Sequence, residues 1–311
     1  MSDKWDSRRI PDQTGRTAIV TGANSGLGLV TARELARHGA HVVLACRNTE
    51  KGAAAKRTIE SEAPGAEVQL AELDLGSLAS VAAFAEAFAS EHRGLDLLIN
   101  NAGVMAPPRR ETADGFELQL GTNLLGHFAL TGRVIGLMEG RTDARVVTLS
   151  SNAHKMGKIN LDDLQSTRGY MRWRAYGQSK LGDLIFALEL DRRLRTRGST
   201  IKSLAAHPGY AATNLQTAAP PLLDRLVMRA ANVVVAQSAE MGALPTLFAA
   251  TEPDLEGGSY FGPDGIGEFR GHPKPVNPSG AARDELVAQR LWDACEELTG
   301  VPFDEGATAA I

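Results

Sequence analysis

The chain has 311 residues, of which 43% are hydrophobic and 23% charged, and its formal net charge is −4. This composition is that of a globular protein with a sizeable core, and it excludes the basic balance of a nucleic-acid-binding protein. Its two cysteines, Cys46 and Cys295, exclude a disulfide framework or a cysteine-rich metal site, so no metal is expected. A polar N-terminus and the lack of an apolar run of about 18 residues predict a cytoplasmic protein with no membrane anchor.

Apolar, β-rich segments alternate with segments of helical composition. The predicted strands are residues 17–21, 41–45, 68–73, 95–100, 145–150 and 201–206, with a weaker candidate at 259–261. The predicted helices are residues 26–38, 49–62, 77–92, 113–138, 174–197 and 281–299. Such alternation indicates a parallel sheet covered on both faces. We therefore predict that residues 1–311 form a single α/β domain of the Rossmann type, a doubly wound sheet of about seven strands in the order 3-2-1-4-5-6-7.

Four segments do not follow this alternation. Residues 1–14 form a polar N-terminal extension, and residues 263–311 a C-terminal extension that is irregular until its last helix. The inserted loop 152–175 either lines a pocket or lies on the surface. Residues 209–241 contain an apolar helical face. This segment is either a helix docked on the domain or a lid over an apolar substrate pocket.

A glycine-rich turn, Thr21–Gly28, follows the first strand and opens the first helix. Backbone amides at a helix N-terminus bind phosphate, and glycine permits the tight turn and the close approach of a ligand. In this context the turn favours dinucleotide binding over a merely structural role. The residues expected to contact the cofactor are Gly22, Asn24, Ser25, Gly26, Leu27 and Gly28.

The end of the second strand, Leu44–Asn48, carries no carboxylate that could accept hydrogen bonds from both ribose hydroxyls. It carries Arg47, and a guanidinium binds phosphate in a bidentate manner. We interpret Arg47 as the ligand of the 2′-phosphate of NADP(H); the alternative is a solvated arginine at a strand end. Cys46 is interpreted as a small filler.

Further cofactor contacts are expected at the ends of the third and fourth strands, from Asp74, Leu75, Asn101, Ala102 and Gly103. The alternatives are a helix N-cap for Asp74 and a structural turn for 101–103.

Tyr176 and Lys180 lie four residues apart at the start of a long predicted helix and therefore share one face. A nearby ammonium favours the phenolate form of a phenol, so Tyr176 is a candidate general acid or base. The pair alone is a weak signal, but its position after the fifth strand strengthens it.

Together these motifs resemble the classical short-chain dehydrogenase/reductase family over roughly residues 14–265. The matching positions are Thr21–Gly28, Asp74, Asn100–Gly103, Asn123, Ser150-Ser151, Tyr176 with Lys180, and Pro208-Gly209. The long spacing from serine to tyrosine, with Leu44–Arg47 and Ser150–His154, is most similar to the retinol-dehydrogenase-like branch.

The resemblance implies a role for each residue of the site. Tyr176 exchanges a proton with the substrate oxygen, and Lys180 binds the nicotinamide ribose and tunes Tyr176. Ser151 hydrogen-bonds the carbonyl, and Asn123 positions a water in a proton relay. The neighbours of the nicotinamide carboxamide are Pro208, Gly209 and Thr213. Ser150 is expected to pack in the core or to cap a helix. His154 and His207 are expected to have structural roles.

The resulting interpretation is an NADP(H)-dependent oxidoreductase that interconverts a carbonyl and an alcohol and reduces a lipophilic aldehyde or ketone. Its partner is a small-molecule substrate, and the resemblance favours a homodimer or homotetramer. The alternative from another class is a non-catalytic NADP(H)-binding regulatory or scaffold protein, against which the presence of all four catalytic residue types argues. A sugar-nucleotide epimerase is disfavoured by the spacing of Gly22, Gly26 and Gly28.

Overall fold

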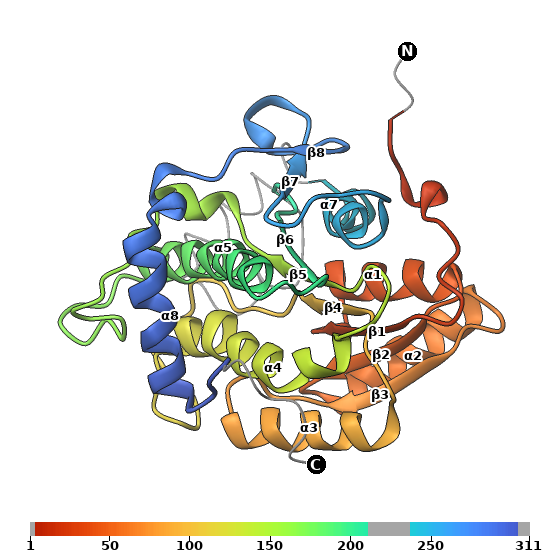
Figure 1. The fold of residues 1–311 in the computed structure, drawn as a ribbon, viewed down its shortest axis with the longest axis horizontal. Helices are drawn as coiled ribbons and strands as arrows, with labels where there is room; N and C mark the ends of the chain where they lie inside the picture. The colour runs from red at the N-terminus through yellow and green to blue at the C-terminus, as the bar shows by residue number, and fades with distance from the viewer. Residues whose placement is uncertain (1–3, 211–236, 304–311) are drawn as a thin grey trace.

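The computed structural model describes residues 4–210 and 237–303, and its centre is one eight-stranded sheet (Figure 1). The strands follow the order β3-β2-β1-β4-β5-β6-β7-β8, and β1 to β7 run parallel. They are β1 (Thr17–Thr21), β2 (His41–Cys46), β3 (Val68–Glu72), β4 (Leu97–Asn100), β5 (Arg145–Leu149), β6 (Lys202–Ala206), β7 (Tyr260–Pro263) and β8 (Pro273–Pro275). The predicted Rossmann-type order is therefore confirmed, with one strand added at the edge.

Successive strand residues point to opposite faces of the sheet, and apolar side chains occur on both faces. Helices therefore cover both faces. One face is covered by α3 (Leu78–Glu91), α4 (Gly126–Val134) and α5 (Arg172–Thr196), with α8 (Glu285–Thr299) packed against α4 and α5. The other face is covered by α1 (Gly26–Arg37), α2 (Thr49–Glu62) and α7 (Ala239–Thr251). In β1, Ile19 belongs to the first core, whereas Ala18 and Val20 belong to the second.

The C-terminal half differs from the sequence prediction in two elements. The strand β8 pairs antiparallel with β7, and its two prolines, which cannot donate backbone hydrogen bonds, are tolerated because the strand is at the sheet edge. The helix α7 was not predicted, because Pro245 lies inside it. Most of its side chains are buried between α1 and the sheet, so it lacks the one-sided apolar stripe of a surface helix.

The helix predicted over residues 113–138 begins later than expected. It starts as a π-helix (Leu120–Leu125), continues as α4 and ends as a 3-10 helix (Ile135–Met138). The carboxylate of Glu117 accepts hydrogen bonds from the amides of Gln119 (2.9 Å) and Leu120 (2.8 Å), and so caps the start. Leu118 and Gln119 are helical, whereas the prediction that residues 113–117 are helical was wrong.

The N-terminal extension is packed on the domain although its sequence is polar. Trp5 is 6% exposed and Ile10 5% exposed. The indole of Trp5 meets Phe248 of α7 edge to face at 5.3 Å and donates a 2.7 Å hydrogen bond to Glu252. The extension therefore contributes to the second core.

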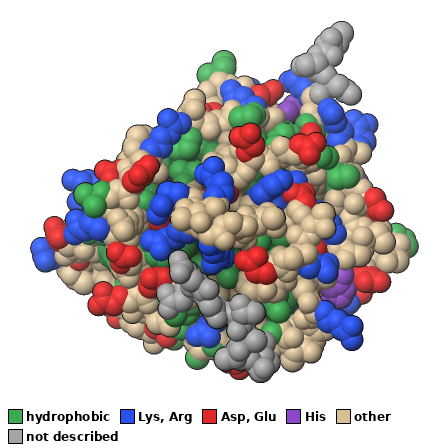
Figure 2. Space-filling view, in the orientation of Figure 1, with side chains coloured by type: hydrophobic (Ala, Val, Ile, Leu, Met, Phe, Trp, Pro, Cys, Tyr) green, Lys and Arg blue, Asp and Glu red, His purple; other side chains and the backbone are tan. Residues whose placement is uncertain are grey.

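Acidic and basic side chains are interspersed on the face shown in Figure 2, with no basic stripe on that face. Within residues 4–210 and 237–303, no helix combines the length and apolar character that a membrane span requires.

Candidate active site

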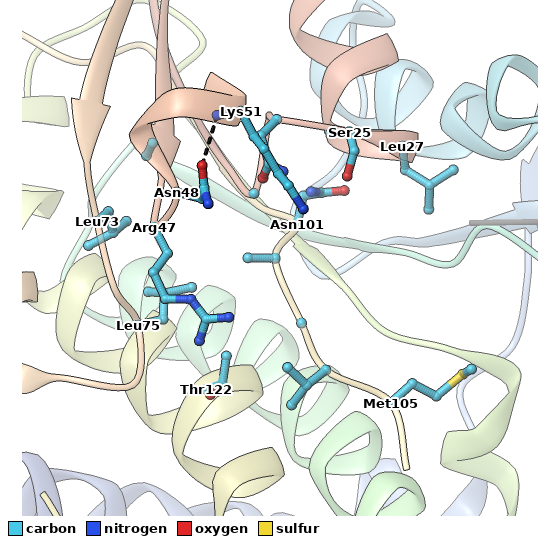
Figure 3. A pocket seen from close by; sticks show the side chains of 18 residues that line it. Ser25, Leu27, Arg47, Asn48, Lys51, Leu73, Leu75, Asn101, Met105 and Thr122 are labelled. Carbon is cyan, nitrogen blue, oxygen red and sulfur yellow. Dashed lines mark hydrogen bonds between the residues drawn. The ribbon is translucent and has the colours of Figure 1, made fainter. Parts of the chain in front are cut away.

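A cavity of about 880 Å³ opens where β1, β2 and β4 end (Figure 3). Most residues predicted to contact the cofactor line it: Gly22, Asn24, Ser25, Gly26, Leu27, Gly28, Arg47, Leu75, Asn101, Ala102 and Gly103. The carboxyl edge of a parallel sheet is where such folds bind ligands. The glycine turn and the residues that follow β2, β3 and β4, distant from one another along the chain, thus meet in one cavity. Among the described residues, Tyr176, Lys180, Pro208 and Gly209 are not part of its lining.

The glycine turn has the backbone shape that its sequence requires. Gly22 and Gly26 have φ of +67° and +56°, in the left-handed region that favours glycine. A Cβ on Gly28 would lie 2.6 Å from the carbonyl oxygen of Gly22, so the helix can approach the turn only with glycine there. Ser25 takes the N-cap position of α1 without making a side-chain cap, which leaves the first amides of α1 open to a phosphate.

Two cationic side chains reach the cavity from β2 and α2. Figure 3 shows Arg47 extending into it on the side of Leu75 and Thr122. Lys51, which the sequence analysis missed, lines the same cavity one turn into α2. In the part of the chain that the structure describes, neither side chain has a hydrogen-bond or ion-pair partner. Cys46 is 1% exposed, and burial raises the pKa of its thiol to about 11, as expected of a filler.

Asp74 lies between Leu73 and Leu75, which both line the cavity, but is not itself a lining residue. Its Oδ1 accepts a 2.9 Å hydrogen bond from the amide of Gly76. Ser77 is the N-cap of α3, so the alternative that Asp74 caps this helix was wrong.

Asn123 is fully buried, although an asparagine inside a helix more often faces solvent. Its Oδ1 accepts from the amide of Val104 (2.8 Å), and its Nδ2 donates to the carbonyl of Val104 (3.1 Å) and to Ser179 Oγ (2.9 Å). The side chain thereby fastens the segment after Gly103 to α5. It lies in the π-helix, a form that often occurs at functional sites.

A buried network behind Asn123 was not predicted. The hydroxyl of Thr21 accepts from the amides of Asn101 and Ala102, both at 2.9 Å, and lies 2.9 Å from His127 Nε2. His127 Nδ1 is 2.7 Å from the carbonyl oxygen of Asn123. Burial lowers the pKa of His127 to about 3, so the ring is neutral and can link a hydroxyl donor to a carbonyl acceptor.

The two serines after β5 take different positions. Ser150 is buried and donates a 2.7 Å hydrogen bond to the carbonyl of Lys180, as expected of a packing residue. Ser151 is the N-cap of a 3-10 helix, η4 (Asn152–Met156), and accepts from the amide of Ala153 (3.2 Å). A Cβ on Gly157 would collide with the carbonyl of Gly177, so η4 packs closely on the first turns of α5, where Tyr176 lies.

Lys180 forms a buried ion pair that the sequence analysis missed. Its Nζ donates to the carbonyl of Leu149 (2.9 Å) and to Asp183 Oδ2 (2.8 Å). Burial opposes the charge of Lys180, but Asp183 and Tyr176 favour it, and the pKa of Lys180 is raised. Burial raises the pKa of Asp183 to about 6, although Lys180 opposes this shift. The only sequence signal for this ion pair was the spacing of three residues between Lys180 and Asp183 on one helix.

Pro208 and Gly209 follow β6. Gly209 has a φ of +66°, and a Cβ there would collide with the carbonyl of Phe269. His154 and His207 are both fully buried, and burial lowers the pKa of each. Thr213 and most of segment 209–241 lie outside the described residues.

The inserted loop 152–175 is folded against the segment after β4. The hydroxyl of Tyr170 donates to the carbonyl of Pro107 (2.9 Å) and accepts from Gln119 Nε2 (2.8 Å). Near the end of the loop, Trp173 meets Tyr176 edge to face, with ring centroids 6.1 Å apart. The end of the insertion therefore lies beside the candidate catalytic tyrosine.

Comparisons with known proteins agree with this geometry. Residues 16–221 match the family described as short chain dehydrogenase. The chain is 40% identical over 298 residues to retinol dehydrogenase 14 of Mus musculus, across 92% of this chain and 86% of that protein. It is 42% identical over 296 residues to polyprenol dehydrogenase of Mus musculus, across 94% of this chain and 86% of that protein.

A solved structure has the same fold over nearly the whole chain. It is an uncharacterized protein from Mycobacterium paratuberculosis, 46% identical, with a TM-score of 0.81 over 97% of this chain and 100% of that one. The chain thus belongs to the short-chain dehydrogenase family, in its retinol-dehydrogenase-like branch, and is an oxidoreductase enzyme that acts on CH–OH groups.

Proposed function

We propose that this enzyme uses NADP(H) to interconvert a carbonyl and an alcohol, and that it reduces a lipophilic aldehyde or ketone. The observation that carries the choice of cofactor is Arg47, whose guanidinium enters the cavity and has no partner among the described residues. An unpaired cation there matches a 2′-phosphate, which NAD(H) lacks.

The cavity fits a dinucleotide: the glycine turn offers free amides at the start of α1, and Gly22 and Gly28 let the turn pack closely against α1 and the segment after β4. The bound nicotinamide would supply or accept the hydride. The residues that would hold the cofactor are those of the turn, Arg47, Asp74, Leu75, Asn101, Ala102, Gly103, Tyr176, Lys180, Pro208, Gly209 and Thr213.

This chain's side chains would handle the proton. Tyr176 would donate it to the substrate oxygen in reduction and remove it in oxidation. Ser151 would donate a hydrogen bond to the carbonyl oxygen, and the charge of Lys180 would stabilise the phenolate left behind. Asn123 would act through the segment after Gly103, which its side chain fastens.

A lipophilic substrate is supported by apolar side chains near Tyr176. Trp173 is 44% exposed beside Tyr176, and Met171 (67%) and Met156 (75%) lie at the start of α5 and the end of η4. Two relatives are named for retinol and polyprenol, both lipophilic alcohols. The apolar helical pattern in the sequence of segment 209–241 also favours the predicted lid over an apolar pocket.

The expected result of a substrate panel is therefore a higher kcat/KM for long aliphatic or aromatic aldehydes than for short hydroxyaldehydes. The measurement is NADPH oxidation by the purified protein over carbonyls matched in reactivity but graded in apolar area. A preference for short polar sugars would overturn the lipophilic assignment. NADPH binding without turnover of any carbonyl would favour the non-catalytic alternative.

Asp183→Asn should shift the pH dependence of reduction, because it removes the counter-ion of Lys180. Lys180 then loses its proton at lower pH, and without that charge the proton transfer from Tyr176 loses its stabilisation. This loss moves the alkaline limb of the kcat/KM profile to lower pH. The broken buried pair also costs about 3–5 kcal/mol of stability.

The matched control is Asp191→Asn, which breaks another ion pair of α5: buried Asp191 with Arg195, at 2.7 Å. It should lower the unfolding temperature and leave the pH profile of activity in place. An unchanged profile in Asp183→Asn would show that this carboxylate serves stability alone.

A further inference from the structure

The loop after β7, residues 264–272, connects the two segments that would hold the reacting groups. The Oε2 atom of Glu268 accepts a 2.9 Å hydrogen bond from Lys155 Nζ and lies 3.2 Å from His207 Nε2. Lys155 belongs to η4, the helix that Ser151 caps. His207 directly precedes Pro208 and Gly209. One carboxylate thus contacts both segments.

The backbone of the loop makes the same two connections. Asn152, the residue after Ser151, donates from Nδ2 to the carbonyl of Glu268 (3.2 Å). Tyr210, the residue after Gly209, donates from its amide to the carbonyl of Phe269 (2.8 Å). The loop therefore lies against both segments, and the carboxylate is its charged contact with each.

His207 contacts both Glu268 and Gly209. The amide of Gly209 donates to His207 Nδ1 (3.2 Å), so the ring proton is on Nε2, the nitrogen that lies 3.2 Å from Glu268 Oε2 without the alignment of a hydrogen bond. His207 is fully buried, whereas the side chain of Glu268 is 21% exposed. The contact with His207, followed by that with Lys155, lowers the pKa of Glu268 to about 2, so the carboxylate is ionised at working pH.

The backbone conformation at Glu268 indicates that a glutamate occupies this position because of its carboxylate. Glu268 has a φ of +59°, directly after Gly267 at +63°. A residue with a Cβ is strained in this region, and glycine is not. A position that served only as a turn would be better filled by glycine.

We propose that Glu268 is a positioning residue, whose carboxylate fixes Ser151 through Lys155 and fixes Pro208-Gly209 through His207. The inference rests on the proposed function, since these segments would hold the substrate carbonyl and the nicotinamide carboxamide. Glu268 touches neither reactant, so its loss should affect kcat and leave binding of the adenosine end of NADPH unchanged.

The test compares Glu268→Gly and Glu268→Gln with Asp254→Gly. Asp254 has the same φ of +59° in an exposed loop, so its replacement relieves the same strain away from the site. Both Glu268 variants should lower kcat on the order of 10-fold, the factor expected for one charge-assisted hydrogen bond, with KM for NADPH within about twofold. Asp254→Gly should keep the wild-type kcat.

Hydrogen exchange provides a readout that does not need turnover. In Glu268→Gly, peptides covering 152–157 and 207–210 should exchange faster than in Asp254→Gly. Wild-type exchange in both peptides, or a wild-type kcat in Glu268→Gly, would overturn the proposal. Absence of turnover in the wild-type protein would instead overturn the proposed function, and the exchange comparison would still decide the role of Glu268.

Discussion

Tyr176→Phe is expected to lower kcat on the order of 10²–10⁴-fold, the usual contribution of a positioned acid or base. The substitution keeps the ring, which is 8% exposed and packs edge to face with Trp173, and deletes the hydroxyl whose proton would go to the substrate. The fold and the cavity should be unaffected, so the Kd for NADPH should hardly change. Steady-state kinetics and a cofactor titration measure the two quantities.

Tyr170→Phe is the matched control for this variant. The hydroxyl of Tyr170, in the inserted loop, bonds Pro107 and Gln119 outside that loop, so its loss should cost stability of about 0.5–1.5 kcal/mol and leave kcat nearly intact. Substantial turnover by Tyr176→Phe with a good substrate would contradict the assigned chemistry.

Arg47→Ala should weaken NADPH binding by about 10–100-fold and leave NADH binding nearly unchanged. A charge-assisted hydrogen bond contributes about 1.5–3 kcal/mol, and about 1.4 kcal/mol corresponds to a factor of ten. The 2′-phosphate is the only difference between the two cofactors, so the effect belongs to that group. Titrations of both cofactors at identical salt measure it.

Arg57→Ala removes the same charge from the exposed side of α2, outside the cavity, and should leave both affinities close to wild type. This control separates a local contact from a change in overall charge. Equal affinities of the wild-type protein for NADPH and NADH, or a preference for NADH, would remove Arg47 from its role.

The central sheet could be predicted from the sequence because its signals are local. The strands from β1 to β6 are short segments rich in apolar residues, and turn or cap residues such as Gly39, with a φ of +97°, separate strands from helices. The elements that were missed depend on the fold itself. The strand β8 consists of two prolines around a lysine, and α7 is buried nearly all round.

The residues of the site also divide into those with local sequence signals and those whose contacts depend on the fold. The glycine turn, Arg47 and the Tyr176–Lys180 pair follow strand ends in recognisable order, and a parallel sheet brings strand ends together. His127 and Glu268 contact Thr21 and His207, partners that only the folded chain brings close, whereas Asp183 lies three residues from Lys180 on one helix. Of these pairs, Glu268 with His207 joins residues 61 positions apart, and no sequence spacing predicts that contact.

The most direct test of the account is a time course with a lipophilic aldehyde, in which NADPH consumed and alcohol formed are both quantified for the wild-type protein and Tyr176→Phe. We expect equimolar NADPH oxidation and alcohol formation by the wild type, and a rate at least about 10²-fold lower in the variant. Equal rates in the two proteins, or NADPH binding by the wild type without any alcohol formed, would contradict it.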